Sequence, residues 1–514
     1  MSSDRNIYLY WVGKEYKLIS ILRDLIYLHS TNGVGYKVNL ITDKNIREYV
    51  KDIPDYFSTL CPAHQADFVR VHVICDYGGI WLDSDTIVVD KLDSLFEIIE
   101  KKNGFFMKEN NIYLVNGVFG SKKQTDLMIK WKTHLMNVLN SKQGKNIGWT
   151  DVGSSILKKI YDSNVNVYDN YEIFNGLDNM YPVYYPKCVN EFIEKPYDNY
   201  KNIVREYQPL VVLVNSVYKN LENKTEKEIL EGNMPINYFI NKSTDLMKIS
   251  VNKLHNNLMI YNYGQKDYIS KSIINSGAWE PNITNIFNNI IENNVSVSSN
   301  HTIIDIGCNI GYFSLICAKH NNVAKIYSVD GNSTNINMLS LSCKRNGLSN
   351  INLINNCISE KVSYFKPSNK EFAESVGNIG GLSFEESNDM TGVISTSIDS
   401  LISENKINRV LIMKIDIEGG ELNALKGAIN TLNTNVVENI IIEITPKFNN
   451  DSMQILEILK DANYNLYNIP HQETGLLNYN KSYLQQIMSS PIQNMTTFMN
   501  TIKIQTNILA VKQS

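Results

Sequence analysis

The sequence predicts an α/β protein with two domains. Strand-like and helix-like apolar segments alternate through the first half, which is typical of an α/β sheet domain. In the second half, an apolar strand over 303–306 runs into Gly307 and Gly311 before a helix, the pattern of a Rossmann-like unit. At 514 residues the chain is also too long for one core, because domains usually hold about 100–200 residues.

Composition excludes several classes of function. Hydrophobic residues make up 43% and charged residues 20%, values typical of a globular protein. The net charge of −4, without a basic run, argues against a nucleic-acid partner. Seven scattered cysteines suit a reducing compartment. We find neither a signal-peptide pattern nor an apolar run of the roughly 20 residues that span a membrane, so we expect a cytoplasmic protein without a membrane-spanning segment.

The first domain is expected to begin with a strand over 7–11, a helix over 20–29 and a second strand over 37–42. Its nucleotide site should lie at the carboxyl ends of the strands. A helix then begins at Pro62, which suits a first helical turn, and ends at the pair Gly78-Gly79.

The chemistry of the first domain is expected after the strand over 80–82. Asp83 and Asp85 lie two apart at its end, so strand alternation should turn both carboxylates the same way. Two convergent carboxylates suit Mg²⁺ or Mn²⁺. Asp67 and Arg70 share one helix face and could bind ribose or sugar hydroxyls while the metal holds a diphosphate. The alternatives are a chance D-x-D and a solvated ion pair.

The whole segment resembles glycosyltransferase family 32 and the capsular-polysaccharide transferases. Their signature reads approximately A-D-x-x-R, then Y-G-G-x-Y-x-D-x-D, and it is matched by Asp67, Arg70, Tyr77, Gly78, Gly79, Asp83 and Asp85, with Trp81 in the usual Tyr position. The resemblance implies a GT-A-type fold, Mn²⁺ or Mg²⁺ on Asp83 and Asp85, a UDP- or GDP-sugar donor, and retention at the anomeric carbon.

The resemblance also implies roles for isolated residues. Trp11 would stack on the nucleotide base, with core packing as the alternative. Asn116 would lie beside the donor sugar, unless Asn-Gly here is only a turn, and Asp151 would lie in an acceptor-side loop. Relatives take a third metal ligand from a His-containing segment that this chain lacks, so Asn215 or Ser216 would substitute.

A second domain follows a polar stretch that starts at about residue 219, and we place the domains at 1–250 and 251–514. Its opening D-x-G-x-N-x-G is the form found in class I S-adenosylmethionine methyltransferases, where Gly307 would let the backbone pass close to the methionine part of the ligand. Asp330, at the end of the next strand, would accept both ribose hydroxyls. The expected cofactor-binding residues are Asp305, Gly307, Asn309, Gly311, Asp330 and Ser359.

Three carboxylates, Asp416, Glu418 and Glu421, surround two glycines after an apolar strand. They would be costly to bury without partners, and the alternative is a solvated turn. The phrase K-I-D-I-E-G-x-E resembles the FkbM family of methyltransferases, as do Gly277–Glu280 and Thr396–Leu401, over about residues 255–514. The resemblance implies an O-methyltransferase, and we expect these carboxylates to take the proton of the acceptor hydroxyl, directly or through a bound cation. Glu443 faces the same edge.

Together these patterns predict a bifunctional enzyme that adds a sugar from a nucleotide-sugar donor to a glycan or saccharide acceptor and O-methylates a sugar hydroxyl. Two alternatives remain for the first domain. One is a non-catalytic glycan-binding module. The other is a haloacid-dehalogenase-like phosphatase with Asp83 as nucleophile, although Ile87 occupies its Thr/Val position. A small nucleic-acid or protein acceptor for the methyl group also remains open.

Overall fold

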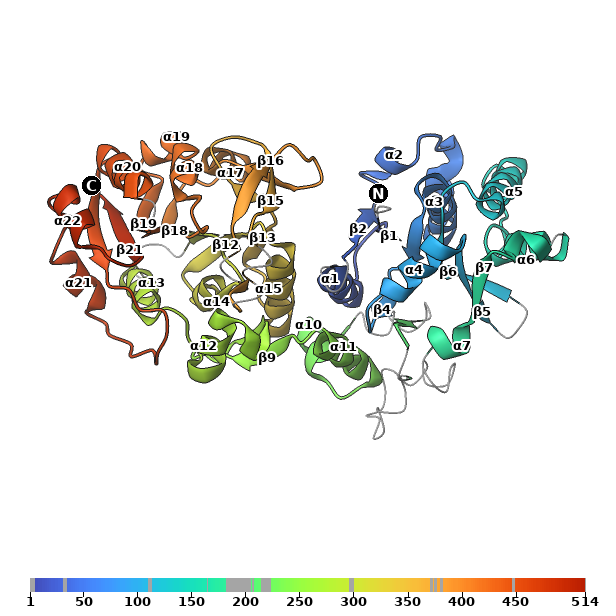
Figure 1. Ribbon diagram of the computed structural model, residues 1–514, viewed down its shortest axis with the longest axis horizontal. Coiled ribbons are helices and arrows are strands. Elements are labelled where there is room, and N and C mark those ends of the chain that lie inside the picture. Colours follow the sequence, from blue (N-terminus) through green and yellow to red (C-terminus); the bar gives the residue numbers. More distant parts are fainter. Residues whose placement is uncertain are drawn as a thin grey trace. The chain divides into compact units, whose positions relative to one another are not determined.

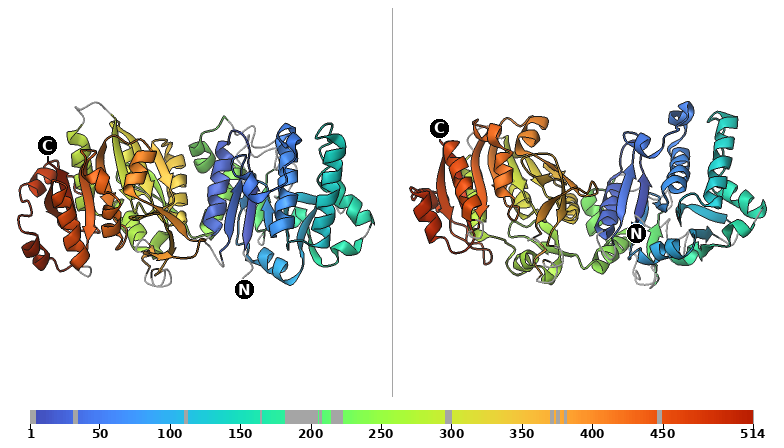
Figure 2. Two further views of the ribbon diagram at one scale, coloured as in Figure 1. Left: turned by 90° about the horizontal axis from the view of Figure 1, so that it is seen from above. Right: turned by 45° about the horizontal axis from the view of Figure 1, so that its top comes forward.

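The computed structural model describes residues 5–30, 35–109, 113–163, 165–181, 205, 208–213, 223–294, 300–369, 373, 377–379, 382–445 and 449–513. The chain divides into two compact units, Met1–Met247 and Lys248–Ser514. The α/β class predicted for a two-domain chain is confirmed, and Figures 1 and 2 show both units. None of the helices described is long and apolar enough to cross a membrane.

Unit 1 is built on a mixed sheet with the strand order β2-β1-β3-β6-β5-β7. Strands β2, β1 and β3 are parallel, and β6 runs antiparallel to both β3 and β5. A separate short pair joins β4 to β8. The strands are β1 (Asn6–Tyr10), β2 (Lys37–Ile41), β3 (Gly79–Leu82), β4 (Thr86–Val88), β5 (Gly104–Glu109), β6 (Tyr113–Ser121), β7 (Tyr171–Asn175) and β8 (Leu210–Val212).

The helices of unit 1 bury apolar residues, those before residue 180 against this sheet, and Figure 1 shows α3 and α5 on the same side of unit 1. They are α1 (Lys17–Ser30), α2 (Ile46–Tyr49), α3 (Pro62–Tyr77), α4 (Asp93–Lys101), α5 (Asp126–Lys142), α6 (Ser154–Ser163), α7 (Gly176–Asn179), α10 (Glu226–Glu231) and α11 (Pro235–Leu246). The last two fall in the polar stretch that showed no strand pattern, where Thr225 and Glu228 form a capping box for α10.

Helix α3 has the bounds that its sequence predicts. Pro62 is its first residue, and Gly78 ends it with φ = 73°. A Cβ on Gly79 would lie 2.5 Å from the carbonyl oxygen of Asn6, so the chain can pass directly from α3 into β3 beside β1 only with glycine there. This tight junction brings the inner face of α3 next to the residues that follow β3.

Unit 2 is built on a seven-stranded sheet with the order β13-β12-β11-β18-β19-β21-β20. All pairs are parallel except those of β21, which runs antiparallel to β19 and β20. This arrangement confirms the Rossmann-like class. The strands are β11 (His301–Ile306), β12 (Val323–Val329), β13 (Ile351–Ile354), β18 (Val410–Ile415), β19 (Val437–Ile444), β20 (Tyr464–Ile469) and β21 (Thr506–Lys512).

Figures 1 and 2 show helices on both faces of this sheet, with α13, α14 and α15 on one face and α17, α18 and α20 on the other. The helices of unit 2 are α12 (Tyr268–Ser276), α13 (Pro281–Asn293), α14 (Tyr312–Ala318), α15 (Ser333–Asn346), α17 (Ile398–Glu404), α18 (Glu421–Lys426), α19 (Ile429–Leu432), α20 (Asn449–Asp461), α21 (Tyr483–Met488) and α22 (Met495–Thr501). Two small sheets add β9 (Ser250–Lys253) with β10 (Met259–Asn262), and β14 (Cys357–Ile358) with β15 (Tyr364–Pro367), β16 (Phe384–Ser387) and β17 (Val393–Thr396).

Candidate functional site

In unit 1, four of the predicted site residues form one polar cluster. Arg70 Nη2 lies 3.0 Å from Asp83 Oδ1, and Arg70 Nη1 lies 3.6 Å from Asp67 Oδ1. Asn116 donates from Nδ2 to Asp67 Oδ1 at 2.7 Å, while its carbonyl oxygen accepts from Arg70 Nη1 at 2.6 Å. Asp67 and Arg70 are 6% and 5% exposed, so α3, β6 and the end of β3 enclose a buried charge network.

Two glycines leave no space around this cluster. A Cβ on Gly117 would lie 2.7 Å from Asp83 Oδ2, and one on Gly153 would lie 2.4 Å from Asn116 Nδ2. Trp81 donates from Nε1 to Asp83 Oδ1 at 2.8 Å, and the Arg70 guanidinium lies 5.2 Å from the centre of its ring. The Asn116-Gly117 pair therefore lies within strand β6, beside Asp83, and not in a turn.

The Asp83-Ser84-Asp85 segment is a tight turn between β3 and β4 and not a continuing strand, because the Thr86 N–H donates to the Asp83 carbonyl oxygen at 3.0 Å. Strand alternation is therefore the wrong reason for the pairing of Asp83 and Asp85. Burial raises the pKa of Asp83, and burial together with the charge of Asp83 raises the pKa of Asp85 well above its usual range. Two carboxylates that repel each other in this way are a donor set that suits a hard divalent cation.

A complete metal shell is not seen among the residues that the structure describes, because none of their His, Cys, Asp and Glu side chains form a group of three or more that could hold an ion. Asn215 and Ser216, the predicted additional ligands, lie outside the described residues. Within the described part, Asp83 and Asp85 would hold the metal.

Trp11 lies directly after β1, where it shares a small hollow with Ser84 of the acidic turn. Its ring meets the ring of Tyr16 edge to face, with centres 5.7 Å apart, and its buried Nε1 has no hydrogen-bond partner among the described residues. Asp151, predicted to lie in an acceptor-side loop, lies in the loop before α6. Its carboxylate accepts from Lys142 Nζ at 2.7 Å and from the Gly148 N–H at 2.8 Å, so it braces the loop before α6.

In unit 2, the predicted residues meet at one edge of the sheet. Ile306 of β11 pairs with Val329 of β12 and with Ile415 of β18, so Gly307, Asp330 and Asp416 follow three adjacent strands. They line a cavity of about 660 Å³, a size typical of sites for small molecules. Asn309, Ser359, Glu418 and Glu443 line the same cavity.

The glycine loop is held by Asp330 and by the neighbouring strand. Asp330 accepts from the Asn309 N–H at 2.8 Å and from the Asn332 N–H at 2.7 Å, and burial raises its pKa to about 6. A Cβ on Gly307, whose φ is 76°, would lie 1.7 Å from the Asp416 carbonyl oxygen. Gly307 is thus required by the close approach of the chain itself, and its approach to a ligand stays a prediction.

Asp305 and Gly311 are not among the residues that line the cavity. Asp305 is 1% exposed and accepts from the N–H and the hydroxyl of Ser314, at 3.1 and 2.6 Å, which holds the first turn of α14. Gly311 is required by packing, because a Cβ there would lie 2.2 Å from Leu339 Cδ1 on α15. Both residues support the loop from behind.

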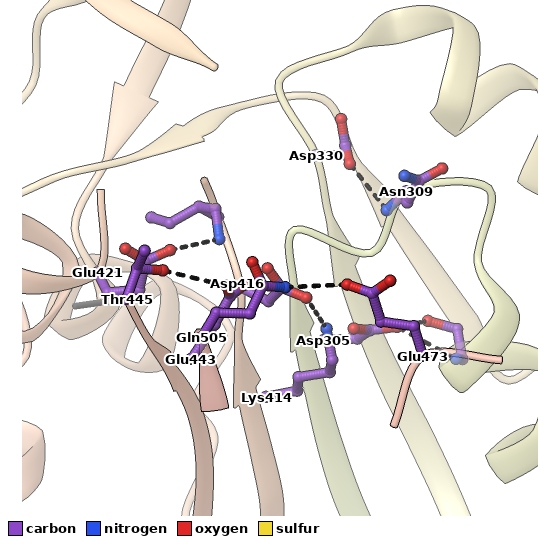
Figure 3. A network of polar contacts seen from close by, with 12 residues as sticks. Asp305, Asn309, Asp330, Lys414, Asp416, Glu421, Glu443, Thr445, Glu473 and Gln505 are labelled. Carbon is purple, nitrogen blue, oxygen red and sulfur yellow. Dashed lines mark hydrogen bonds and ion pairs between the residues drawn. The ribbon is translucent and has the colours of Figure 1, made fainter. Parts of the chain in front are cut away.

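Buried Lys414 and partly buried Asp416 form an ion pair, with Nζ 2.6 Å from Oδ2 (Figure 3). Burial lowers the pKa of Lys414, but the carboxylates of Asp416, Glu280 and Asp305 together raise it by more. The net pKa lies above its usual value, so the ammonium keeps its charge. Burial would raise the pKa of Asp416, but Lys414 and a hydrogen bond with Glu443 lower it. Burial and the charge of Asp416 raise the pKa of Glu443 to about 11. Glu443 therefore stays protonated and donates a hydrogen bond to Asp416.

Glu418 and Glu421 have different environments. Glu418 lines the cavity with φ = 56°, and burial together with the charges of Asp416 and Glu421 raises its pKa to about 8. Glu421 instead accepts from the N–H groups of Ile417 at 2.8 Å and Gly419 at 3.1 Å, so it fixes the turn before α18. Glu421 is 8% exposed, whereas Glu418 and Gly419 are exposed, so this turn is partly solvated.

Part of the cavity wall was missed by the sequence reasoning. Tyr268, Trp279, Glu280 and Glu473 all line it, and Lys414 supplies its buried positive charge. The available signal was the Gly277–Glu280 segment, which was noted only as a resemblance. Glu473 has no local pattern, because it follows β20 in a loop.

Comparison with known proteins divides the chain in the same way. A family described as capsular polysaccharide synthesis protein matches residues 1–191, and the methyltransferase FkbM domain matches residues 305–466. No curated protein matches the chain. These matches confirm the two predicted resemblances. They support transferase activity for a chain whose second unit is similar to the FkbM methyltransferases.

Among solved structures, the chain is similar to the PaToxG glycosyltransferase at 18% identity, covering 32% of this chain and 73% of that one with a TM-score of 0.22. It is similar to a glycosyltransferase involved in glycosylation of the major capsid of PBCV-1 at 12% identity, covering 42% and 95% with a TM-score of 0.27. It is also similar to the putative methyltransferase SMU.1697c from Streptococcus mutans, in complex with SAH, at 10% identity, covering 45% and 97% with a TM-score of 0.24.

Proposed function

We propose that the chain is a bifunctional glycan-modifying enzyme. The first unit transfers a sugar from a UDP- or GDP-sugar with Mn²⁺ or Mg²⁺, and the second O-methylates a sugar hydroxyl with S-adenosylmethionine. The family matches to a capsular polysaccharide synthesis protein and to an FkbM domain support glycan chemistry and methyl transfer in one chain. A glycan or saccharide is the acceptor of both steps, which are consecutive.

The observation that carries the proposal for unit 1 is the Asp67–Arg70–Asp83–Asn116 cluster beside Asp85. Arg70 is tied to both carboxylates and to the Asn116 carbonyl oxygen, so it fixes Asp83 where β3 ends. A divalent cation on Asp83 and Asp85 would offset the charge of the leaving diphosphate. Trp11, which shares a small hollow with Ser84, would stack on the nucleotide base.

The observation that carries the proposal for unit 2 is the cavity that Gly307, Asn309 and Asp330 line together with the carboxylates of Asp416, Glu418 and Glu443. Asp330 and the glycine loop suit the ribose and the adjoining part of S-adenosylmethionine, and Ser359 suits the adenine. The methyl donor supplies a good leaving group, so the protein must align the acceptor hydroxyl and take its proton. Of the carboxylates that the sequence predicted for this work, Asp416 and Glu418 line the cavity, and Glu421 holds the turn between them.

A screen of the full chain tests the sugar-transfer step. We expect nucleotide-diphosphate release from one member of a panel of UDP- and GDP-sugars, in the presence of Mn²⁺ or Mg²⁺, and no release by the Asp83→Asn variant. Exposed Asp126→Asn on α5 is the matched control and should keep the wild-type rate. Failure to turn over any sugar nucleotide, together with binding of glycans, would identify unit 1 as a glycan-binding module. Release of inorganic phosphate from phosphate esters would instead indicate a phosphatase.

The methyl-transfer step is tested with methyl-labelled S-adenosylmethionine and the glycan product of the first step. We expect label in the saccharide, in alkali-stable ether linkage. Label in protein or nucleic acid alone would contradict the proposal.

A further inference from the structure

The wall of the unit 2 cavity that the cofactor assignments leave unused is made of aromatic and acidic side chains. The rings of Tyr268 and Trp279 meet edge to face, with centres 5.7 Å apart and an interplanar angle of 87°. Tyr268 is hydrogen-bonded to Glu473, and Glu280 follows Trp279 directly. All four residues line the cavity of about 660 Å³ that also contains Gly307 and Asp330.

Glu280 is the residue in this wall that is poised for a ligand. It is 6% exposed, it lines the cavity, and its Oε2 has no hydrogen-bond partner among the described residues. Its φ is 41°, a conformation that is costly for a residue with a side chain and that is often retained at functional sites. Its N–H donates to the Glu473 carbonyl oxygen at 2.9 Å, which holds this conformation.

Hydrogen bonds between the segment after β20 and helix α13 fix the position of Glu280. Three asparagines on α13 donate to carbonyl oxygens of that segment, with distances of 2.8 Å for Asn282 to Pro470, 3.2 Å for Asn285 to Asn478 and 2.9 Å for Asn289 to Asn480. This ladder ties the start of α13, where Glu280 lies, to the loop that supplies Glu473. The wall is therefore preorganised.

The charges of the lining disfavour an acidic acceptor. Its acidic residues are Glu280, Asp330, Glu385, Glu386, Asp416, Glu418, Glu443 and Glu473, whereas Lys414 is the only Lys or Arg among the described lining residues. Lys414 is already paired with Asp416. Beside Glu280 and Glu473, a carboxylate or phosphate on the substrate would find no Lys or Arg among the described lining residues other than the paired Lys414. Hydroxyl and ammonium groups would find acceptors there, and aromatic rings can pack against the apolar face of a sugar.

We propose that Tyr268, Trp279, Glu280 and Glu473 form the acceptor subsite of unit 2, that it takes a neutral or amino sugar and rejects acidic sugars, and that Glu280 accepts the proton of the hydroxyl that is methylated. This inference rests on the methyltransferase activity proposed above. The hydroxyl oxygen forms the bond to the methyl carbon while the sulfur–methyl bond breaks, with its electron pair left on sulfur. The proton goes to the Glu280 carboxylate. Burial, with the charges of Asp416 and Glu473, raises the pKa of Glu280 to about 8, although Lys414 opposes this shift.

The substrate class is tested by methyl transfer from labelled S-adenosylmethionine, by the full chain, to oligosaccharides that match except at one position. That position carries a hydroxymethyl, an amino or a carboxylate group. We expect label in the neutral and amino members and at least tenfold less in the acidic one. Equal or preferential labelling of the acidic member overturns the subsite while leaving the methyltransferase proposal intact. Label in no saccharide overturns both.

The role of Glu280 is tested by the Glu280→Gln variant. We expect kcat to fall roughly 10²- to 10⁴-fold, and the rise of the wild-type rate with pH up to about 8 to disappear, while the Kd for S-adenosylmethionine, measured by calorimetry, stays unchanged. Trp279→Ala should instead raise the acceptor KM. The exposed Glu404→Gln on α17 is the control and should match wild type.

A second readout does not need an acceptor. Because Glu280 is buried with a raised pKa, its charge destabilises the native state as pH rises through about 8, so Glu280→Gln should raise Tm at pH 9 more than at pH 5. Wild-type kcat and pH profile in Glu280→Gln would overturn its assignment as proton acceptor.

Discussion

Arg70 and Asp83 form an ion pair of 3.0 Å that joins helix α3 to the end of strand β3. The same guanidinium also lies 3.6 Å from Asp67, which is 6% exposed and would be a costly buried charge without it. The pair therefore has two roles, since it compensates a carboxylate in the core and fixes a carboxylate at the site.

The Arg70→Met variant should consequently lose both stability and activity. Removing one partner of a buried charge network costs roughly 3–5 kcal/mol, and we expect the lower end because the side chain of Asp83 is 33% exposed. Chemical denaturation of the full chain measures this loss, and diphosphate release measures activity. The exposed Arg47→Met on α2 is the control. A variant with unchanged stability would mean that Asp67 is uncharged in the native protein.

Asp85 should be required for sugar transfer in a way that depends on metal. We expect Asp85→Asn to lower the transfer rate by at least 10²-fold, because the charge of the leaving diphosphate would be poorly offset, and a chelator should do the same to wild type. Added Mn²⁺ should restore wild type but not the variant. Undiminished transfer in chelator would disprove the metal site and would leave Arg70 and Asp85 to be explained without a cation.

Local signals in the sequence predict much of this structure. Pro62 and Gly78 mark the bounds of α3, and the sheet edge of unit 2 follows from strands that end at Gly307, Asp330 and Asp416. These features depend on residues within one turn or one strand, so periodicity and capping rules can find them.

Other features depend on residues distant in sequence. Which atom a Cβ on Gly311 would meet depends on how α15 packs, and the contact of Asn116 with Asp67 depends on the register of β6 against β3. Glu280 was missed because its partners, Asp416 and Glu473, come from other strands and loops. The Asp83–Asp85 pairing was predicted for the wrong reason. Two carboxylates spaced two residues apart fit both a strand end and a tight turn, and the spacing alone cannot tell these apart.

Gly307 and Gly347 allow steric overlap to be separated from backbone strain. Both have positive φ, 76° and 66°, but a Cβ on Gly307 would lie 1.7 Å from the Asp416 carbonyl oxygen, whereas nothing lies within 4 Å of one on Gly347. Gly347→Ala should cost about 1 kcal/mol from strain. Gly307→Ala should cost several times more and abolish S-adenosylmethionine binding, as measured by denaturation and calorimetry. Equal costs would show that β11 and β18 can separate at this edge.

Binding of S-adenosylmethionine should weaken as pH falls through about 6. Burial raises the pKa of Asp330 from 3.8 to about 6, and only the ionised carboxylate accepts both ribose hydroxyls with full strength. Affinity should be highest above pH 7. The stability of the unliganded protein should depend on pH in the opposite direction. Asp330 favours the native state at low pH, and that contribution is lost as pH rises through about 6.

The Asp330→Ala variant is the matched test of this dependence. We expect it to lose roughly 1.5–3 kcal/mol of binding free energy at pH 7.5 and to lose the slope between pH 5 and 7. Calorimetric titrations at four pH values measure both. A slope that persists in Asp330→Ala would assign it to another group in the cavity, such as Glu280 or Glu418, whose pKa values are both raised to about 8.

The two units should fold and work as separate fragments. The described hydrophobic clusters each lie within one unit, one around β18 and β19 and two around the sheet of unit 1, so each unit has its own core. We expect fragments 1–247 and 248–514 to unfold cooperatively when expressed alone. The second should bind S-adenosylmethionine with the Kd of the full chain. Aggregation or a weaker Kd would mean that one core is incomplete.

If the two steps are consecutive, the fragment 248–514 should methylate only the product of the first fragment, because the newly added sugar supplies the hydroxyl that is aligned with the methyl donor. Adding the fragments in sequence, with mass spectrometry after each step, tests this order. Methylation of the unextended acceptor would reverse it. In the full chain the second step should be faster, because tethering raises the local concentration to about the millimolar range, and mixing separate fragments at micromolar concentration should remove that gain.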